Sequence, residues 1–174
     1  MPRAAPVAVL MGSDSDLPVM AECVRVLEDY GVGHDTRVLS AHRSPDDAAR
    51  FARTAAARGV KVIVAGAGGA AHLAGVMAAH TTVPVIGVPL DSSPLGGFDA
   101  LLATVQMPPG VPVATVGVGT MGARNAGHLA ATILALADAG LAEKLRRRRE
   151  RMVQEVRARS KALPRRLREV LERK

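Results

Sequence analysis

Five short apolar runs dominate the first 140 residues, and each is followed by a polar or glycine-rich loop and a helical pattern. The runs are Val7–Met11, Thr36–Leu39, Val60–Ala65, Val83–Val88 and Val111–Val118. Continuous apolar runs of this length are typical of parallel strands that are covered on both faces. We therefore predict an α/β protein, a three-layer α/β/α sandwich around a parallel five-stranded sheet of flavodoxin-like type.

The helical patterns between these runs have recognisable ends. Asp16 can cap the first helix, which has Pro18 in its first turn and stops at Gly31. Further helices are predicted over Pro45–Arg58, a short stretch ending near His80, Phe98–Val105 and Ala123–Ala139. After Gly140 a charged helix is expected to run to about Leu163, where Pro164 interrupts it. We thus expect one domain over residues 1–163, with its C-terminal helical extension, and a basic tail over residues 164–174.

Right-handed crossovers place the loops after all five strands at the same edge of the sheet. These loops are residues 12–16, 40–43, 66–72, 89–97 and 119–122. Because ligands of open α/β sheets bind outside the carboxyl ends of the strands, we predict the functional site at this edge.

The loop after the second run carries the strongest chemical signal. Ser44 is expected to be the N-cap of the next helix, with Pro45 at its first position and Asp47 completing a capping box. Capping explains Ser44 but not the His42–Arg43 pair before it. A proton carrier beside a fixed cation suits proton transfer on an anionic, phosphorylated substrate, whereas the alternative is a solvated pair without a function.

Two other loops have competing interpretations. The segment Gly12–Asp16 can hold an anion on its N–H groups and hydroxyls, or it can simply turn the chain and cap a helix. The run Gly66–Ala71 fits the alanine-ending form of G-x-G-x-x-G, and Asp91 follows it at the distance of a ribose-binding acid. We favour a loop that lets backbone approach a ligand closely, and dinucleotide binding stays as an alternative. The histidines His72, His80 and His128 do not have the spacing of a metal site.

The charge of the chain is concentrated at its C-terminal end. The whole chain has a net charge of +7, but residues 1–140 hold 9 Lys/Arg and 11 Asp/Glu, whereas residues 141–174 hold 14 and 5. The single cysteine, Cys23, is interpreted as a buried small hydrophobe and is compatible with a reducing compartment. We expect a cytoplasmic protein without a membrane span, and we do not expect nucleic acid as its partner.

Six segments, in this order and at these spacings, resemble one enzyme family. They are Met11–Asp16, Ser40–Arg43, Gly66–Leu73, Gly87–Pro89, Gln106–Pro108 and Asn125–Ala126. Over roughly residues 6–150 the chain resembles class I N5-carboxyaminoimidazole ribonucleotide mutase, the catalytic-subunit family of phosphoribosylaminoimidazole carboxylase. The resemblance implies a homo-octamer, a phosphoribosyl imidazole substrate, and no cofactor, metal or ATP. It also implies a functional link to the ATP-dependent enzyme that makes the carbamate substrate.

The resemblance also assigns site residues. It implies that His42 is the catalytic acid and base, that Ser13 and Arg43 bind phosphate oxygens, and that Asp16 binds a ribose hydroxyl. Further substrate contacts are implied for Gly12, Ser40, Ala41, Gly68, Gly69, Ala70, His72 and Leu73. In this chemistry the carbamate loses CO2, which is recaptured at ring C4, and one imidazole can handle both proton transfers.

The chain departs from the family pattern in three places. Ala74 stands where a proline usually follows His-Leu, Gly119–Gly122 is an unusual loop, and no counterpart aligns beyond about Arg159. Arg43 matches the mutase class, whereas the related class that uses CO2 directly usually has Lys there. That direct carboxylase remains the first alternative, and a nicotinamide-dependent oxidoreductase or a nucleic-acid-binding module comes after it.

The C-terminal helix carries a narrow apolar stripe among many arginines. Its members are Leu141, Leu145, Met152, Val156 and Leu163. A stripe of this width suits packing across a subunit boundary. Residues 165–174 are expected to form a short, solvated helix.

Overall fold

The computed structural model describes residues 5–172, which contain one parallel sheet of five strands. The strands are β1 (Val7–Met11), β2 (His34–Val38), β3 (Val62–Gly68), β4 (Val85–Leu90) and β5 (Ala114–Thr115). Their order is β2-β1-β3-β4-β5, and every neighbouring pair is parallel. This is the flavodoxin-like order, so the predicted fold class is confirmed.

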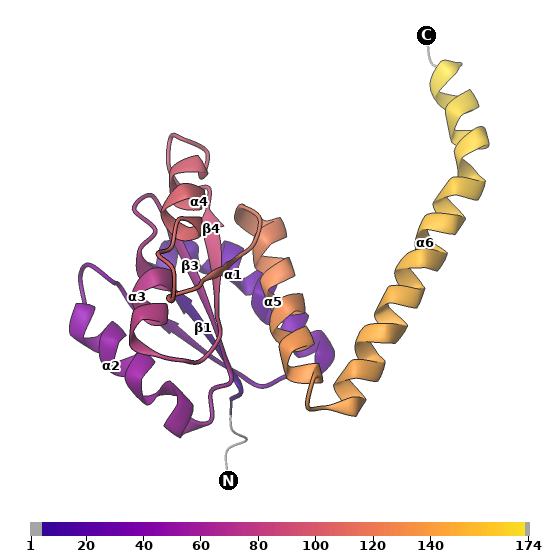
Figure 1. Ribbon diagram of the computed structural model, residues 1–174. Helices are drawn as coiled ribbons and strands as arrows, with labels where there is room; N and C mark the ends of the chain where they lie inside the picture. The colour runs from indigo at the N-terminus through magenta and orange to yellow at the C-terminus, as the bar shows by residue number, and fades with distance from the viewer. Residues whose placement is uncertain (1–4, 173–174) are drawn as a thin grey trace. The chain divides into compact units, whose positions relative to one another are not determined.

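Helices follow each strand and cover the sheet on both faces (Figure 1). They are α1 (Leu17–Tyr30), α2 (Pro45–Ala55), α3 (Leu73–His80), α4 (Phe98–Val105) and α5 (Gly119–Ala135), with short 3-10 turns over Asp14–Asp16 and Ala56–Arg58. The chain forms two compact units, divided between Leu134 and Ala135, and the second contains the long helix α6 (Ala139–Leu171). No helix described between residues 5 and 172 combines the length and the apolar character needed to cross a membrane.

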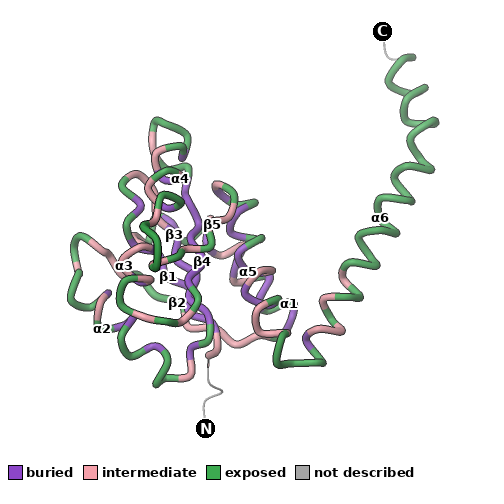
Figure 2. The backbone as a smooth tube through the Cα atoms, viewed as in Figure 1, coloured by how far each residue is buried: buried purple, intermediate pink, exposed green. Residues whose placement is uncertain are grey.

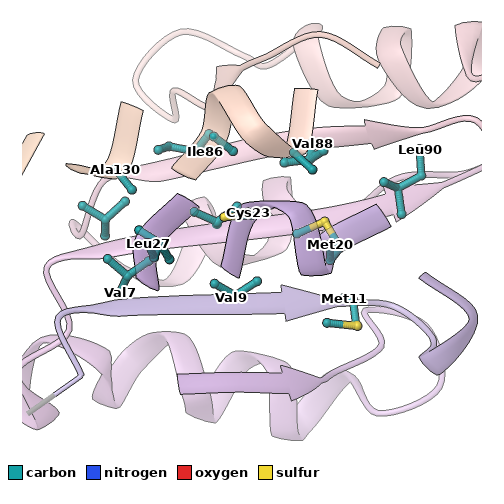
Figure 3. Packing of buried hydrophobic residues seen from close by; sticks show 14 residues of the cluster. Val7, Val9, Met11, Met20, Cys23, Leu27, Ile86, Val88, Leu90 and Ala130 are labelled. Atoms are coloured by element: carbon teal, nitrogen blue, oxygen red, sulfur yellow. The ribbon is translucent and has the colours of Figure 1, made fainter. Parts of the chain in front are cut away.

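The core of the first unit has two layers because side chains of β1 point alternately to opposite faces of the sheet. Val7, Val9 and Met11 pack with α1 and α5, whereas Ala8 and Leu10 pack with α2 and α3. Figure 3 shows Met20, Cys23 and Leu27 of α1 against the first set. Burial of each such leucine or methionine is worth about 1.5–3 kcal/mol, so these contacts hold the layers together.

Cys23 lies within this core, as its helical pattern predicted. Burial raises the pKa of its thiol to about 12, so the sulfur stays protonated at neutral pH. A protonated, enclosed thiol is a poor nucleophile, and the interpretation of Cys23 as a small hydrophobe is confirmed.

Burial in the sheet falls from its centre to its edges. β1 and β4 are buried throughout and β3 over most of its length, whereas β2 is half-buried to exposed (Figure 2). The short β5 pairs only through Ala114 and Thr115, where Val111–Val118 was predicted as a strand. The longer prediction is wrong because this is an edge strand: Pro112 has no N–H to donate, and only the Val116 N–H continues the pairing, to the Gly87 carbonyl.

Two predicted loops belong to regular elements instead. β3 continues through Gly66, Ala67 and Gly68, which pair with the end of β4, so the glycine run is partly strand. A Cβ at Gly66 would collide with the Met20 sulfur, which explains the glycine by close packing. Residues 119–122 form the first turn of α5, where a loop was expected.

Helix α6 runs without a break through Pro164, so the predicted interruption there is wrong. Proline removes the N–H that would bond the carbonyl of Ser160. Both residues are exposed, and water can bond that carbonyl, so the helix continues past the proline.

Candidate functional site

A cavity of about 240 Å³ lies at the carboxyl edge of the sheet, where the strand order reverses between β1 and β3. Such a reversal point is where ligands bind in folds of this type. The lining residues are Gly12, Ser13, Ser15, Asp16, Ser40, Ala41, His42, Arg43, Ala67, Gly68, Ala70, His72, Leu73 and Ser92. Every predicted site residue except Gly69 is among them.

Ser15, Ala67 and Ser92 also line the cavity, although they were not singled out from the sequence. Ser15 lies within a segment that was already assigned to this edge. Ser92 follows β4, and a Cβ at Gly68 would collide with its hydroxyl oxygen. Glycine at position 68 therefore lets the end of β3 approach the Ser92 side chain directly.

The loop after β2 is held by two serine hydroxyls. Ser40 Oγ accepts hydrogen bonds from the backbone N–H groups of His42 and Arg43, at 3.4 and 3.0 Å. Ser44 Oγ accepts from the Ser40 N–H at 3.0 Å and donates to the Ser40 carbonyl at 3.2 Å. These bonds fix a tight turn that presents His42 and Arg43 side by side at the cavity.

The capping box predicted for α2 is not formed. Ser44 occupies the N-cap position, but its hydroxyl is engaged with Ser40 and makes no cap bond. The Asp47 carboxylate pairs with Arg50 one turn later. A capping box forms instead at Ser13 and Asp16, where the Ser13 N–H donates to Asp16 Oδ2 at 3.0 Å.

His42 and His72 meet inside the site, although 30 positions separate them. The distance from His42 Nε2 to His72 Nδ1 is 2.8 Å, and the two rings lie edge to face with an interplanar angle of 85°. One of these nitrogens must carry the hydrogen and the other must accept it. The contact therefore links the donor and acceptor roles of the two rings. Within residues 5–172, no three His, Cys, Asp or Glu side chains come together in a way that could hold a metal ion.

Arg43 ties two loops of the site together. Its Nη2 donates to the Gly12 carbonyl at 3.0 Å, which joins the loop after β2 to the loop after β1. A guanidinium carries five N–H donors in a planar fork. Arg43 can therefore hold this carbonyl and still bind an anion in the cavity.

The loop after β1 gathers hydroxyls around a buried carboxylate. The Ser13 and Ser15 hydroxyl oxygens are 2.9 Å apart, and Asp16 is only 8% exposed. Burial raises the pKa of Asp16 above its ordinary value, and this effect outweighs the hydrogen bonds from Ser13 and Gly12 and the charge of Arg43, which act in the opposite direction. The ionised form of Asp16 is thus disfavoured in the folded chain, and the hydrogen bonds and the nearby Arg43 charge only partly offset this effect.

This effect leads to a stability prediction. Because the pKa of Asp16 is higher in the folded than in the unfolded chain, folding favours the protonated acid, and its contribution declines as pH rises through the folded value. We expect Asp16→Asn to raise the melting temperature at pH 7 while lowering activity. The exposed Asp46→Asn, on α2 and outside this loop, is the control in thermal unfolding, and equal melting temperatures for both variants would contradict the assignment.

The geometry does not fit dinucleotide binding by the glycine run. Gly66 and Gly68 lie within β3, and of the run only Gly69 has a left-handed backbone, with φ of +58°. The Asp91 carboxylate lies at the start of α5, where a Cβ on Gly119 would be 3.2 Å from Asp91 Oδ2, and Asp91 does not line the cavity.

Comparisons with known proteins identify the family of this chain. The family model described as AIR carboxylase matches residues 6–155. N5-carboxyaminoimidazole ribonucleotide mutase of Pyrococcus abyssi is 57% identical over 146 residues, which is 84% of this chain and 83% of that protein. The Bacillus subtilis protein of the same name is 54% identical over 150 residues, covering 86% and 93%.

The fold comparison leads to the same family. The crystal structure of Treponema denticola PurE superposes with a TM-score of 0.82 at 26% sequence identity and covers 90% of this chain and 97% of that one. With the family model spanning most of the sheet and its helices, and with mutases more than half identical over most of their length, this chain belongs to the AIR carboxylase family.

Proposed function

We propose that this chain converts N5-carboxyaminoimidazole ribonucleotide to 4-carboxy-5-aminoimidazole ribonucleotide in purine biosynthesis. Its mutase relatives are 50–57% identical, which supports this reaction over others. The observation that carries the proposal is the His42–His72 contact in one cavity with Arg43 and Asp16. This arrangement combines a proton carrier with groups that suit a phosphoribosyl substrate.

The substrate would be anchored by the two loops that Arg43 joins. The Arg43 guanidinium and the Ser13 hydroxyl are suited to phosphate oxygens, and the Ser15 hydroxyl lies beside them. Asp16 can accept a hydrogen bond from a ribose hydroxyl while it holds the Ser13 N–H. Anchoring at this end would place the imidazole ring toward His42 and the end of β3.

His42 would perform both proton transfers. The carbamate N–C bond breaks, its electron pair stays on nitrogen, and His42 supplies the proton that completes the amine as CO2 forms. Ring C4 then attacks the carbon of CO2, and His42 takes the C4 proton, which restores the ring and the protonated imidazole. The two transfers balance, so no other acid or base is consumed in the cycle.

Small residues near His42 suit the retention of CO2 between these steps. Gly68 and Ala70 line the same cavity as His42. A cavity of about 240 Å³ filled by the substrate would leave little room for diffusion of CO2 away from C4. Recapture then becomes effectively unimolecular, where orientation contributes most to rate.

A labelling experiment tests the reaction. Purified protein is given substrate with 13C in the carbamate, in buffer containing unlabelled bicarbonate, and the product is analysed by mass spectrometry. A mutase that holds its CO2 keeps the label in the product. Loss of the label, together with product formation from aminoimidazole ribonucleotide and bicarbonate at the same rate, would identify a direct carboxylase instead.

The proposal includes a homo-octamer in the cytoplasm, working with the ATP-dependent enzyme that makes the carbamate. The proximal half of α6, residues 139–155, supports assembly, because its apolar side chains Met152 and Val153 are exposed in the single chain. A buried, unpaired cysteine is compatible with a reducing compartment. Carbamates of this kind lose CO2 readily in water, so an enzyme that supplies the substrate nearby would limit this loss.

Truncation tests the role of α6 in assembly. Deleting residues 141–174 is expected to dissociate the oligomer and to lower activity with it, because the apolar side chains of the proximal half of α6 are removed. Deleting only residues 165–174 should leave assembly and activity unchanged. Size-exclusion chromatography with light scattering measures both, and a fully assembled, active 1–140 protein would contradict the expectation.

A further inference from the structure

The apolar stripe of α6 repeats with a spacing of eleven residues and continues beyond the part of the helix considered above. Leu141, Met152 and Leu163 form one row, and Leu145, Val156 and Leu167 form a second. Eleven residues make three turns of a helix, so each row stays on one face along the whole length. In the distal half Val156, Leu163 and Leu167 are 64%, 60% and 55% exposed.

Arginines flank this stripe on both sides in the distal half. At 100° per residue, Arg159 and Arg166 lie along one border of the stripe, and Arg157 and Arg168 lie along the other. Residues 156–174 contain eight Lys/Arg and two Glu, a net charge of +6. Within the described residues 156–172, Arg165 forms an ion pair with Glu169, and the distance from Arg165 Nε to Glu169 Oε1 is 3.3 Å.

The family match ends at residue 155, so the distal half of α6 lies outside the part of the chain shared with the family model. We infer that residues 156–172 of α6 are a docking surface for an acidic amphipathic helix of a partner protein. The aliphatic rows would pack against the apolar face of that helix, and the flanking arginines would pair with its carboxylates.

Charge and composition separate this partner from the alternatives. If two copies of this segment paired with each other, their arginine borders would lie side by side. The repulsion between these like charges opposes such pairing. Residues 135–174 contain no aromatic residue, whereas helices that lie in membrane interfaces and surfaces that bind single-stranded nucleic acid use aromatic side chains. Nucleic acid would also leave the aliphatic rows without a function.

The test uses the full chain and an acidic probe peptide labelled with a fluorophore. The peptide keeps the apolar residues of positions 152–172, carries glutamate at each Arg and Lys position, and has alanine in place of Pro164. We expect it to bind the full chain, measured by fluorescence anisotropy, and to bind more weakly as salt is raised.

Matched variants separate the stripe from simple charge attraction. The double variant Leu163→Asp, Leu167→Asp replaces the last residue of each apolar row with a charged one. The control Ala158→Asp, Ala162→Asp makes the same change in charge on the opposite face of α6. The stripe variant should weaken binding at least ~10-fold, and the control less than about threefold. Circular dichroism and enzyme activity, expected unchanged in both, report that the fold is intact.

Several results would overturn the inference. Equal weakening by both variants would mean that binding is electrostatic alone, and the absence of peptide binding would remove the docking surface. Stronger binding of the full chain to phosphatidylglycerol vesicles or to single-stranded RNA than to the peptide would assign the surface to those ligands. A smaller oligomer in the stripe variant, seen by light scattering, would show that a second copy covers the stripe.

Discussion

His42→Asn is expected to lower kcat by at least ~100-fold while leaving the fold and substrate binding nearly intact. Asparagine preserves a polar side chain of similar reach at the mouth of the cavity but cannot carry a proton between nitrogen and C4. The Ser40 hydroxyl bonds that shape this loop go to backbone N–H groups, so the turn does not depend on the imidazole. Steady-state kinetics measures the loss of kcat, and competition by inorganic phosphate reports whether substrate binding is retained.

His72 provides the comparison for this variant. Its Nδ1 contacts His42 Nε2 at 2.8 Å, so we treat it as a positioning residue that orients the His42 ring. His72→Asn should lower kcat less than His42→Asn does, because the partner that orients His42 is lost while the proton carrier itself remains. If His42→Asn kept activity within a few-fold of the unmodified protein, another group would have to carry the proton.

The central part of the fold could be predicted because its strands are continuous apolar runs. β1 was predicted with its full bounds, and parallel connection then placed the loops with Ser13, Asp16, His42 and Arg43 at one edge. The edge strand β5 was predicted too long, since apolar composition does not reveal where pairing stops. A pattern in the sequence shows which residues are buried. It is a poorer guide to which hydrogen bonds form.

The two capping boxes illustrate this limit. Ser13 and Asp16 have the same spacing as Ser44 and Asp47, yet only the first pair forms the box. The difference comes from competing partners: Ser44 bonds the Ser40 backbone, and Asp47 pairs with a neighbouring arginine. The Ser44 partner depends on the path of the loop after β2, which the spacing of a capping box does not specify.

The His42–His72 contact could not be predicted from the sequence, for a related reason. Topology brings the loops after β2 and β3 to one edge, but the distance between two side chains depends on the backbone of both loops. Here the Ser40 turn directs His42, and the left-handed Gly69 precedes the turn that carries His72 into α3. Sequence reasoning could therefore name both histidines but not their contact.

Arg43→Ala is expected to raise KM by roughly 30- to 1000-fold with a smaller effect on kcat, because charge-assisted hydrogen bonds to the phosphate are lost. Competition by inorganic phosphate, which we expect to be weak in the unmodified protein, should also disappear. The variant loses the Arg43 bond to the Gly12 carbonyl as well, so part of the effect comes from a looser junction between the two loops.

Arg43→Lys separates these two contributions. Lysine keeps the positive charge but not the planar fork, so it can attract phosphate without making two parallel bonds. A KM between those of the unmodified protein and Arg43→Ala would therefore support phosphate binding by Arg43. If kcat fell sharply in both variants while KM stayed unchanged, Arg43 would act on the reacting carboxylate instead, and phosphate binding would have to be assigned to the Ser13 and Ser15 hydroxyls and the backbone beside them.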